Sequence, residues 1–80
     1  MPSAITPRLT ELRRQFGIRV REVREQRGLT QETLGEMAEV DRKTINRIEN
    51  GAYSPLLDHV FKISDALQVS AAELFRQPIS

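Results

Sequence analysis

The chain has 80 residues, a formal net charge of +1 and no cysteine. This length allows one small core and excludes a second domain of ordinary size, while the lack of cysteine excludes a disulfide framework and a thiolate metal site. The longest apolar run is far shorter than the ~20 residues that span a bilayer, so no membrane span is predicted. The lack of cysteine fits a reducing compartment, and we expect a cytoplasmic protein.

A first helix is predicted to begin after Thr6, whose side chain can cap it, with Pro7 at its first position. Its apolar stripe consists of Leu9, Leu12, Phe16, Val20 and Val23. Gly28 is typical of the residue that ends a helix. Because Gly17 interrupts the stripe, we expect this helix to kink or break there.

Two short helices are predicted between residues 30 and 51. Thr30 is a good N-cap for the first, whose apolar positions are Leu34, Met37 and Ala38. Asp41 can cap the second, which carries the apolar pair Ile45 and Ile48 and ends at Gly51. Isolated helices shorter than about 12–15 residues are marginal in water. These two must therefore pack on each other and on a scaffold, as they do in a helix-turn-helix.

The second of these helices presents a polar face. Lys43, Asn46, Arg47 and Asn50 fall opposite the apolar pair. Lys43 and Arg47 are four residues apart, and two like charges at this spacing are unfavourable unless an anion lies against them. Arg and Lys pair with guanine in the major groove and Asn pairs with adenine. The pattern favours DNA binding, and a merely solvated helix face is the alternative.

Two further helices complete the chain. Pro55 prevents Ser54 from being helical, so a loop follows Gly51. A helix is then predicted from about residue 57 to residue 67, presenting Leu57, Val60, Phe61, Ile63, Ser64 and Leu67. Ser70 is expected to cap a short last helix in a capping box with Glu73.

The sequence contains no recognisable catalytic motif. The single histidine, His59, has no cysteine, second histidine or glycine-rich phosphate loop to accompany it. We expect His59 to be a surface or edge residue. The sequence therefore predicts no catalytic residue, no metal site and no cofactor, and it argues against an enzyme.

A longer spacing pattern resembles a known family. Its positions are Gln31, Leu34, Gly35, Ala38, Val40, Ile45, Ile48, Glu49 and Gly51, flanked by RGLTQ (27–31) and DALQVSAAELF (65–75). They are similar to the helix-turn-helix domain of lambda-repressor-like and Cro-like regulators, the XRE family. The resemblance implies an all-α fold, a compact five-helix domain over residues 14–75. Residues 1–13 would be an N-terminal extension or the start of helix 1, and residues 76–80 a short C-terminal tail.

The resemblance also implies roles for individual residues. Base contacts would come from Arg42, Lys43, Asn46 and Arg47, and contacts to the DNA backbone from Gln31, Thr44 and Asn50. Arg24 would form a structural ion pair with Glu49, holding the first helix against the recognition helix. Two positions depart from the family pattern: Glu39 stands in the turn where glycine is usual, at a site that tends to need positive φ, and Gly35 stands where alanine is commoner.

The function implied is a sequence-specific transcriptional regulator. It would bind double-stranded DNA as a homodimer on a pseudo-palindromic operator, as restriction–modification controllers and phage repressors do. Its location would be the bacterial cytoplasm, nucleoid-associated when bound, and RNA polymerase is a further possible partner. Leu74 and Phe75 would form the dimer interface or close the core. The alternative is an antitoxin or protein-bridging module, which would use the same fold to bind a protein.

Overall fold

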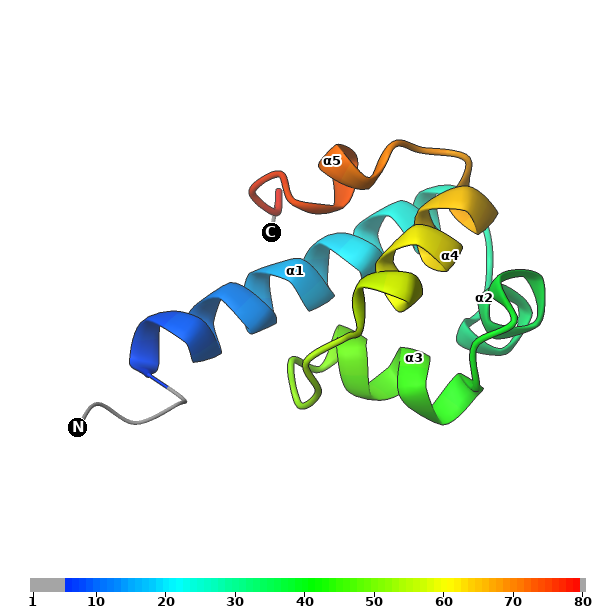
Figure 1. Ribbon diagram of the computed structural model, residues 1–80. Helices are drawn as coiled ribbons and strands as arrows, with labels where there is room; N and C mark the ends of the chain where they lie inside the picture. Colours follow the sequence, from blue (N-terminus) through cyan, green and yellow to red (C-terminus); the bar gives the residue numbers. More distant parts are fainter. Residues whose placement is uncertain (1–5, 80) are drawn as a thin grey trace.

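The computed structural model describes residues 6–79, and that stretch folds into helices without any strand. The helices are α1 (Pro7–Gln26), α2 (Gln31–Ala38), α3 (Arg42–Glu49), α4 (Leu57–Leu67) and α5 (Ala71–Leu74) (Figure 1). The predicted all-α, five-helix domain is confirmed. Among the described helices, none combines the length and apolar character needed to cross a membrane.

Helix α1 runs without interruption through Gly17, so the expected break is wrong. Its start is as predicted, since Thr6 Oγ1 accepts a hydrogen bond from the Leu9 amide at 3.1 Å. A Cβ atom on Gly17 would lie 2.2 Å from the carbonyl oxygen of Ile48. The glycine is therefore the contact point at which α1 crosses α3 closely. Residues 7–13, part of the predicted N-terminal extension, form the first turns of α1. Residues 1–5 of that extension and Ser80 of the predicted C-terminal tail lie outside the described residues.

The turn between α2 and α3 has the predicted backbone. Glu39 ends α2 in the left-handed region with φ of 56°, where glycine is usual. The next residue, Val40, donates its amide to the Gly35 carbonyl at 2.9 Å. A Cβ atom on Gly35 would lie 2.6 Å from the Val40 carbonyl oxygen. In this chain, therefore, the tight turn requires the glycine that departs from the family pattern.

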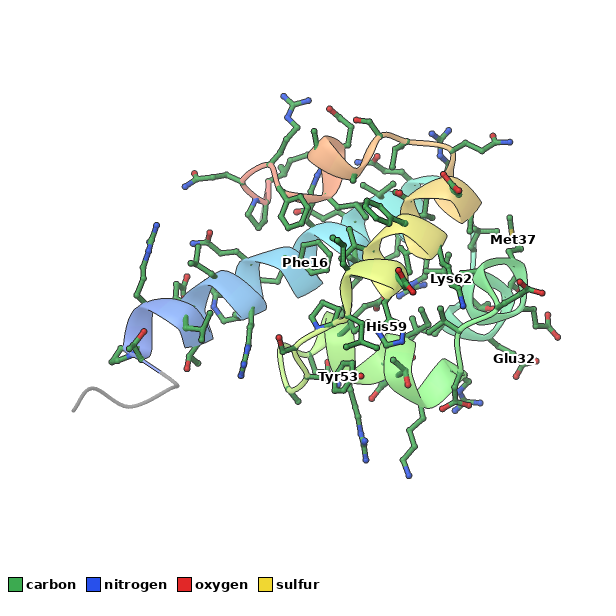
Figure 2. All side chains as sticks on the ribbon, in the orientation of Figure 1. Phe16, Glu32, Met37, Tyr53, His59 and Lys62 are labelled. Carbon is green, nitrogen blue, oxygen red and sulfur yellow. The ribbon has the colours of Figure 1, made fainter. Side chains whose placement is uncertain are left out.

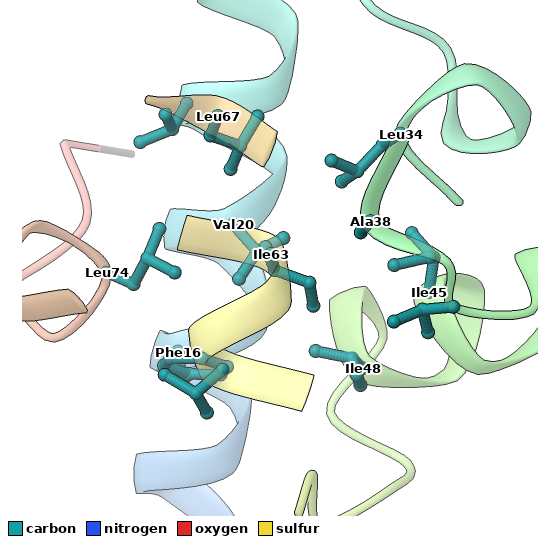
Figure 3. Close-up of a cluster of buried hydrophobic side chains, with 12 residues drawn as sticks. Phe16, Val20, Leu34, Ala38, Ile45, Ile48, Ile63, Leu67 and Leu74 are labelled. Carbon is teal, nitrogen blue, oxygen red and sulfur yellow. The ribbon is translucent and has the colours of Figure 1, made fainter. Parts of the chain in front are cut away.

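The core is built from one face of every helix (Figure 3). The most buried large side chains are Leu34, Ile45, Ile48, Ile63, Leu67, Leu74 and Val20. Four residues predicted on apolar faces are instead exposed: Leu12 by 42%, Met37 by 52%, Leu57 by 64% and Phe61 by 51%. Helical spacing places them at the edges of their stripes, and the neighbouring helices cover only the centres.

The last helix requires two corrections. Leu74 was expected at a dimer interface, but its side chain is fully buried and points toward α1 (Figure 3), so it closes the monomer core. The Ser70 side chain makes no capping hydrogen bond to α5. The Glu73 carboxylate instead accepts hydrogen bonds from Arg76 and lies 3.6 Å from Arg19. Arg19 itself is buried and donates from Nε to the Glu73 carbonyl at 2.8 Å, which anchors α5 to α1.

Candidate nucleic-acid interface

The outward face of α3 carries Lys43, Asn46 and Arg47, all exposed. Ile45 and Ile48 on the opposite face are buried against α1 and α2, which turns the three polar side chains to solvent. In Figure 1, α3 lies on the side of the molecule away from α5, with α2 beside it. The face can therefore approach a large ligand without obstruction from α5.

A chain of hydrogen bonds joins the amide side chains of α2 and α3. Asn46 donates from Nδ2 to Gln31 Oε1 at 3.2 Å, and Asn50 donates to Asn46 Oδ1 at 3.2 Å. Arg21 of α1 donates to Asn50 Oδ1 at 3.3 Å. The structure thus brings together Gln31, Asn46 and Asn50, which the sequence had singled out separately. The bonds orient their amide groups before any ligand binds.

A buried ion pair lies beneath this amide chain. Arg24 donates from Nε to Glu49 Oε2 at 2.6 Å and from Nη2 to Oε1 at 3.0 Å. Its third bond, to the Leu29 carbonyl at 2.7 Å, reaches the loop before α2. The Glu49 side chain is fully buried, and its hydrogen bonds raise the pKa of Arg24. Gln31 Nε2 also donates to Glu49 Oε1, at 3.0 Å, so the ion pair and the amide chain form one network.

Arg21 is a member of this network that sequence reasoning missed. Its Nε lies 3.4 Å from Glu49 Oε1, and its side chain is 45% exposed. The signal was available, because Arg21 precedes Arg24 by three residues and so shares its helix face. This second arginine connects the buried carboxylate to the exposed edge of α3.

The remaining predicted contacts differ in their surroundings. Arg42 is exposed and pairs with Glu32 of α2 at 3.7 Å. It borders an open recess of about 470 Å³ at the start of α2, which is also lined by Thr30, Gln31, Glu32 and Arg24. The positive end of the α2 dipole lies there, which suits an anion such as a phosphate. Thr44 is half-buried, so less of its side chain is available to a ligand.

His59 has a local structural role. Its Nδ1 accepts a hydrogen bond from the Leu56 amide at 3.2 Å, at the start of α4. Its ring lies 5.9 Å from that of Tyr53, in the loop after α3 (Figure 2). Over residues 6–79, no three His, Cys, Asp or Glu side chains are grouped so that they could hold a metal ion.

Comparisons with known proteins agree with this geometry. A family model described as helix-turn-helix matches residues 20–74. An uncharacterized HTH-type transcriptional regulator of Archaeoglobus fulgidus is 39% identical over 57 residues, which are 71% of this chain and 81% of the relative. One of Methanothermobacter thermautotrophicus is 48% identical over 48 residues, 60% of this chain and 70% of the relative.

Solved structures have the same fold. The restriction-modification controller protein C.AhdI of Aeromonas hydrophila superimposes with a TM-score of 0.78 at 36% identity, covering 79% of this chain and 96% of the controller. The hypothetical transcription factor NHTF of Neisseria gives 0.81 at 27% identity, covering 98% of this chain and 90% of its own.

Proposed function

The chain belongs to the helix-turn-helix family of transcriptional regulators, and from this premise we propose that it binds a pseudo-palindromic operator as a homodimer. The family consists of DNA-binding regulators rather than enzymes. In the proposed complex the two copies of α3 enter successive major grooves, about 34 Å apart. The observation that carries the proposal is the outward face of α3, where Lys43, Asn46 and Arg47 stand exposed above a buried apolar pair.

Asn46 is the proposed reader of adenine. Each amide side chain has two N–H donors and an oxygen with two lone pairs. Asn46 uses one donor toward Gln31 and accepts one bond from Asn50, so one donor and one lone pair remain. Those are the groups needed for a bidentate contact with adenine. The network can therefore stay intact while the base is read.

The basic residues take the other roles. Lys43 and Arg47 are proposed to contact guanine, and Arg42 to reach the edge of the site from the first turn of α3. Gln31, Thr44 and Asn50 are proposed to contact the sugar–phosphate backbone, which fixes the register of α3 in the groove. The half-buried position of Thr44 supports a backbone contact rather than a base contact.

The likeness to C.AhdI supports a controller-type role for this chain. Repression would follow when the bound dimer blocks RNA polymerase, and activation when the dimer contacts it. Either role requires the same operator contacts through α3. DNA selection therefore tests the proposal before the direction of control needs to be known.

The test is selection from a randomised duplex library with the purified protein. The Lys43→Ala/Arg47→Ala variant removes two charges from α3, and the Lys62→Ala/Arg76→Ala control removes two exposed charges elsewhere. We expect the wild type and the control to enrich one inverted repeat, and the α3 variant to enrich none. Enrichment of the same repeat by the α3 variant would contradict the proposal. No enrichment by the folded wild type would favour a protein-binding module, and partner capture would follow.

A single substitution then tests base reading. Arg47→Ala should lose about 1–3 kcal/mol of discrimination at one base pair of the selected site. Lys62→Ala, which lies on α4, should leave the base preference unchanged. Unchanged selectivity in Arg47→Ala would remove Arg47 from the base contacts.

A further inference from the structure

The amide chain on α2 and α3 closes into a ring through two charged residues. Arg21 donates from Nη2 to Asn50 Oδ1 at 3.3 Å and from Nε to Glu49 Oε1 at 3.4 Å. At the other end, Gln31 Nε2 donates to the same carboxylate oxygen at 3.0 Å. Asn50 donates to Asn46 at 3.2 Å, and Asn46 donates to Gln31 at 3.2 Å. The ring therefore joins α1, α2 and α3, and Asn46 is its member on the outward face of α3.

The two charged residues can each take part in this ring in only one way. An arginine side chain carries N–H donors and no acceptor, whereas an ionised carboxylate only accepts. Asn50 must therefore turn its oxygen toward Arg21, and Gln31 must turn its nitrogen toward Glu49. A donor that faces a donor, or an oxygen that faces an oxygen, leaves both groups without a hydrogen bond, and this is costly where water is excluded.

These two constraints fix the direction of the amide that lies between them. Asn50 has its oxygen on Arg21, so its nitrogen donates to Asn46 Oδ1. Gln31 has its nitrogen on Glu49, so its oxygen accepts from Asn46 Nδ2. Both ends of the ring thus demand the same orientation of Asn46. The oxygen and nitrogen of an amide are so alike in size that packing alone would not choose between its two orientations.

From the proposed function, in which Asn46 reads adenine, we infer that Arg21 and Glu49 are positioning residues for base recognition. They set the base preference of Asn46 by fixing the direction of its amide. Adenine carries a donor, the N6 amino group, at the place where guanine carries the acceptor O6, and both bases have N7 beside it. An amide whose oxygen faces this place accepts from adenine and opposes guanine. The same amide turned over would donate to guanine O6 instead.

Arg21 is not needed to neutralise the buried carboxylate. Arg24 already donates to both oxygens of Glu49, at 2.6 and 3.0 Å. At 3.4 Å, and with 45% of its side chain exposed, Arg21 adds little to that ion pair. Its guanidinium instead reaches from Glu49 to Asn50, a geometry that orienting the amides requires and charge neutralisation does not.

The test releases the two ends of the ring separately and together. Arg21→Met frees Asn50, and Gln31→Met disconnects Asn46 from Glu49, so the double variant removes both constraints. Competition binding with duplexes that differ at one base pair of the selected site measures the base preference of each protein. Asn46→Ala first identifies the pair that Asn46 reads, as the position at which the adenine preference is lost.

The adenine-over-guanine preference at this pair is the quantity to compare. Because each end sets the same direction, we expect it to fall less than about 3-fold in either single variant but about 10-fold or more in the double variant. The preferences at the pairs read by Lys43 and Arg47 should not change, whereas a general loss of structure would weaken all of them. An unchanged adenine preference in the double variant would overturn the inference.

Two further variants separate direction from charge and from composition. Arg21→Lys combined with Gln31→Met keeps an end that only donates, so it should retain most of the adenine preference that Arg21→Met/Gln31→Met loses. Gln26→Met/Arg27→Met is the matched control, since it replaces the same two residue types at exposed positions at the end of α1. The control should keep the preference of the wild type. A lysine variant as unselective as the double methionine variant would contradict the positioning role.

The direction of the amides can also be measured by NMR without DNA. In the free wild type, the side-chain amide protons of Asn46 should give NOEs to the Gln31 side chain, and those of Asn50 to the Asn46 side chain. NOEs in the opposite sense would overturn the inference, whatever the variants do. Circular dichroism checks that the variants stay folded, as we expect because the pair of Arg24 with Glu49 is untouched.

The pattern of DNA binding separates this inference from the operator proposal. A double variant that binds all duplexes more weakly, with its adenine preference unchanged, would assign Arg21 to the DNA backbone and overturn the positioning role alone. An Asn46→Ala protein that keeps every base preference would overturn that role in the same way. A folded wild type that selects no DNA, although its NOEs have the expected directions, would refute the operator proposal and the base preference together.

Discussion

Replacing Arg24 with methionine should destabilise the domain more than any other single change in the α1–α3 contact. The substitution keeps the length of the aliphatic stem and removes the charge that faces Glu49. It deletes the bonds at 2.6 and 3.0 Å to the carboxylate and the 2.7 Å bond to the Leu29 carbonyl. A carboxylate that is fully buried is then left without its principal counter-charge.

The magnitude follows from burial. Removing one partner of a buried ion pair costs about 3–5 kcal/mol. Arg21 at 3.4 Å and Gln31 at 3.0 Å still face Glu49, so we expect about 3 kcal/mol, at the lower end of that range. A domain of this size has a free energy of unfolding of roughly 4–12 kcal/mol. The loss corresponds to a fall in Tm of about 12–24 °C.

Urea and thermal unfolding followed by far-UV circular dichroism measure the effect, because the chain has no tryptophan. Arg14→Met is the matched control: its pair with Glu11 is equally short, 2.7 Å, but the side chains are 55% and 42% exposed. Exposed pairs contribute little, so the control should melt close to the wild type. The double variant Arg24→Met/Glu49→Met removes the buried charge as well and should recover most of the loss.

The reasoning would be refuted if Arg24→Met lost less than about 1 kcal/mol, or if the two single arginine variants melted together. It would also be refuted if the double variant Arg24→Met/Glu49→Met were less stable than Arg24→Met by another ~3 kcal/mol. In that case the side chains would act through packing and not through charge.

Three further predictions follow from local geometry. Gly17→Ala should lower the free energy of unfolding by about 1–3 kcal/mol, since the clash with α3 exceeds the ~1 kcal/mol gain in helix propensity. Thr10→Ala, at an exposed position of the same helix, is its control. A higher Tm for Gly17→Ala would contradict the close crossing. Glu39→Gly should raise the free energy of unfolding by about 0.5–1 kcal/mol, because glycine adopts the left-handed backbone without strain. The control Glu36→Gly, inside α2, should lower it by about 1 kcal/mol. If urea unfolding showed a change of the same sign for both variants, the backbone strain at Glu39 would be refuted. Hydrogen bonds, the bond from Arg14 first, lower the pKa of Glu11 below its usual value of 4.5. Because both side chains are largely exposed, we expect a small downward shift and a small contribution to stability, which is present above pH 4.5 and is lost as the pH falls below it. An NMR titration midpoint that stays at 4.5 at low salt would disprove the pairing.

Local signals in the sequence were sufficient to predict the helices and the polar face of α3. The left-handed turn at Glu39 was expected from the resemblance to the family. The caps at Thr6 and Thr30 and the stop at Gly51, in contrast, depend on residues within four positions of each other. Such signals are read from spacing alone, because the backbone groups that they satisfy lie on the same helix. The exposure of Lys43, Asn46 and Arg47 follows in the same way from the period of α3. Their contacts with bases remain a prediction.

Contacts between helices could not be derived from spacing. Gly17 looked like a helix breaker, and only the crossing of α1 over α3 shows why it is needed. Leu74 and Phe75 are neighbours of the same chemical kind, yet one is fully buried and the other is 64% exposed. The position of α5 against α1 decides between them.

The sequence by itself thus determined the elements, the turn and the polar face of α3. The tertiary structure decided which partners meet: Arg21 with Glu49, Gln31 with Asn46, and Arg19 with the α5 backbone. These pairs are separated by 15 or more residues, and their distances depend on helix crossing angles. Those angles are set by the packing of the whole core, which no local window of the chain contains.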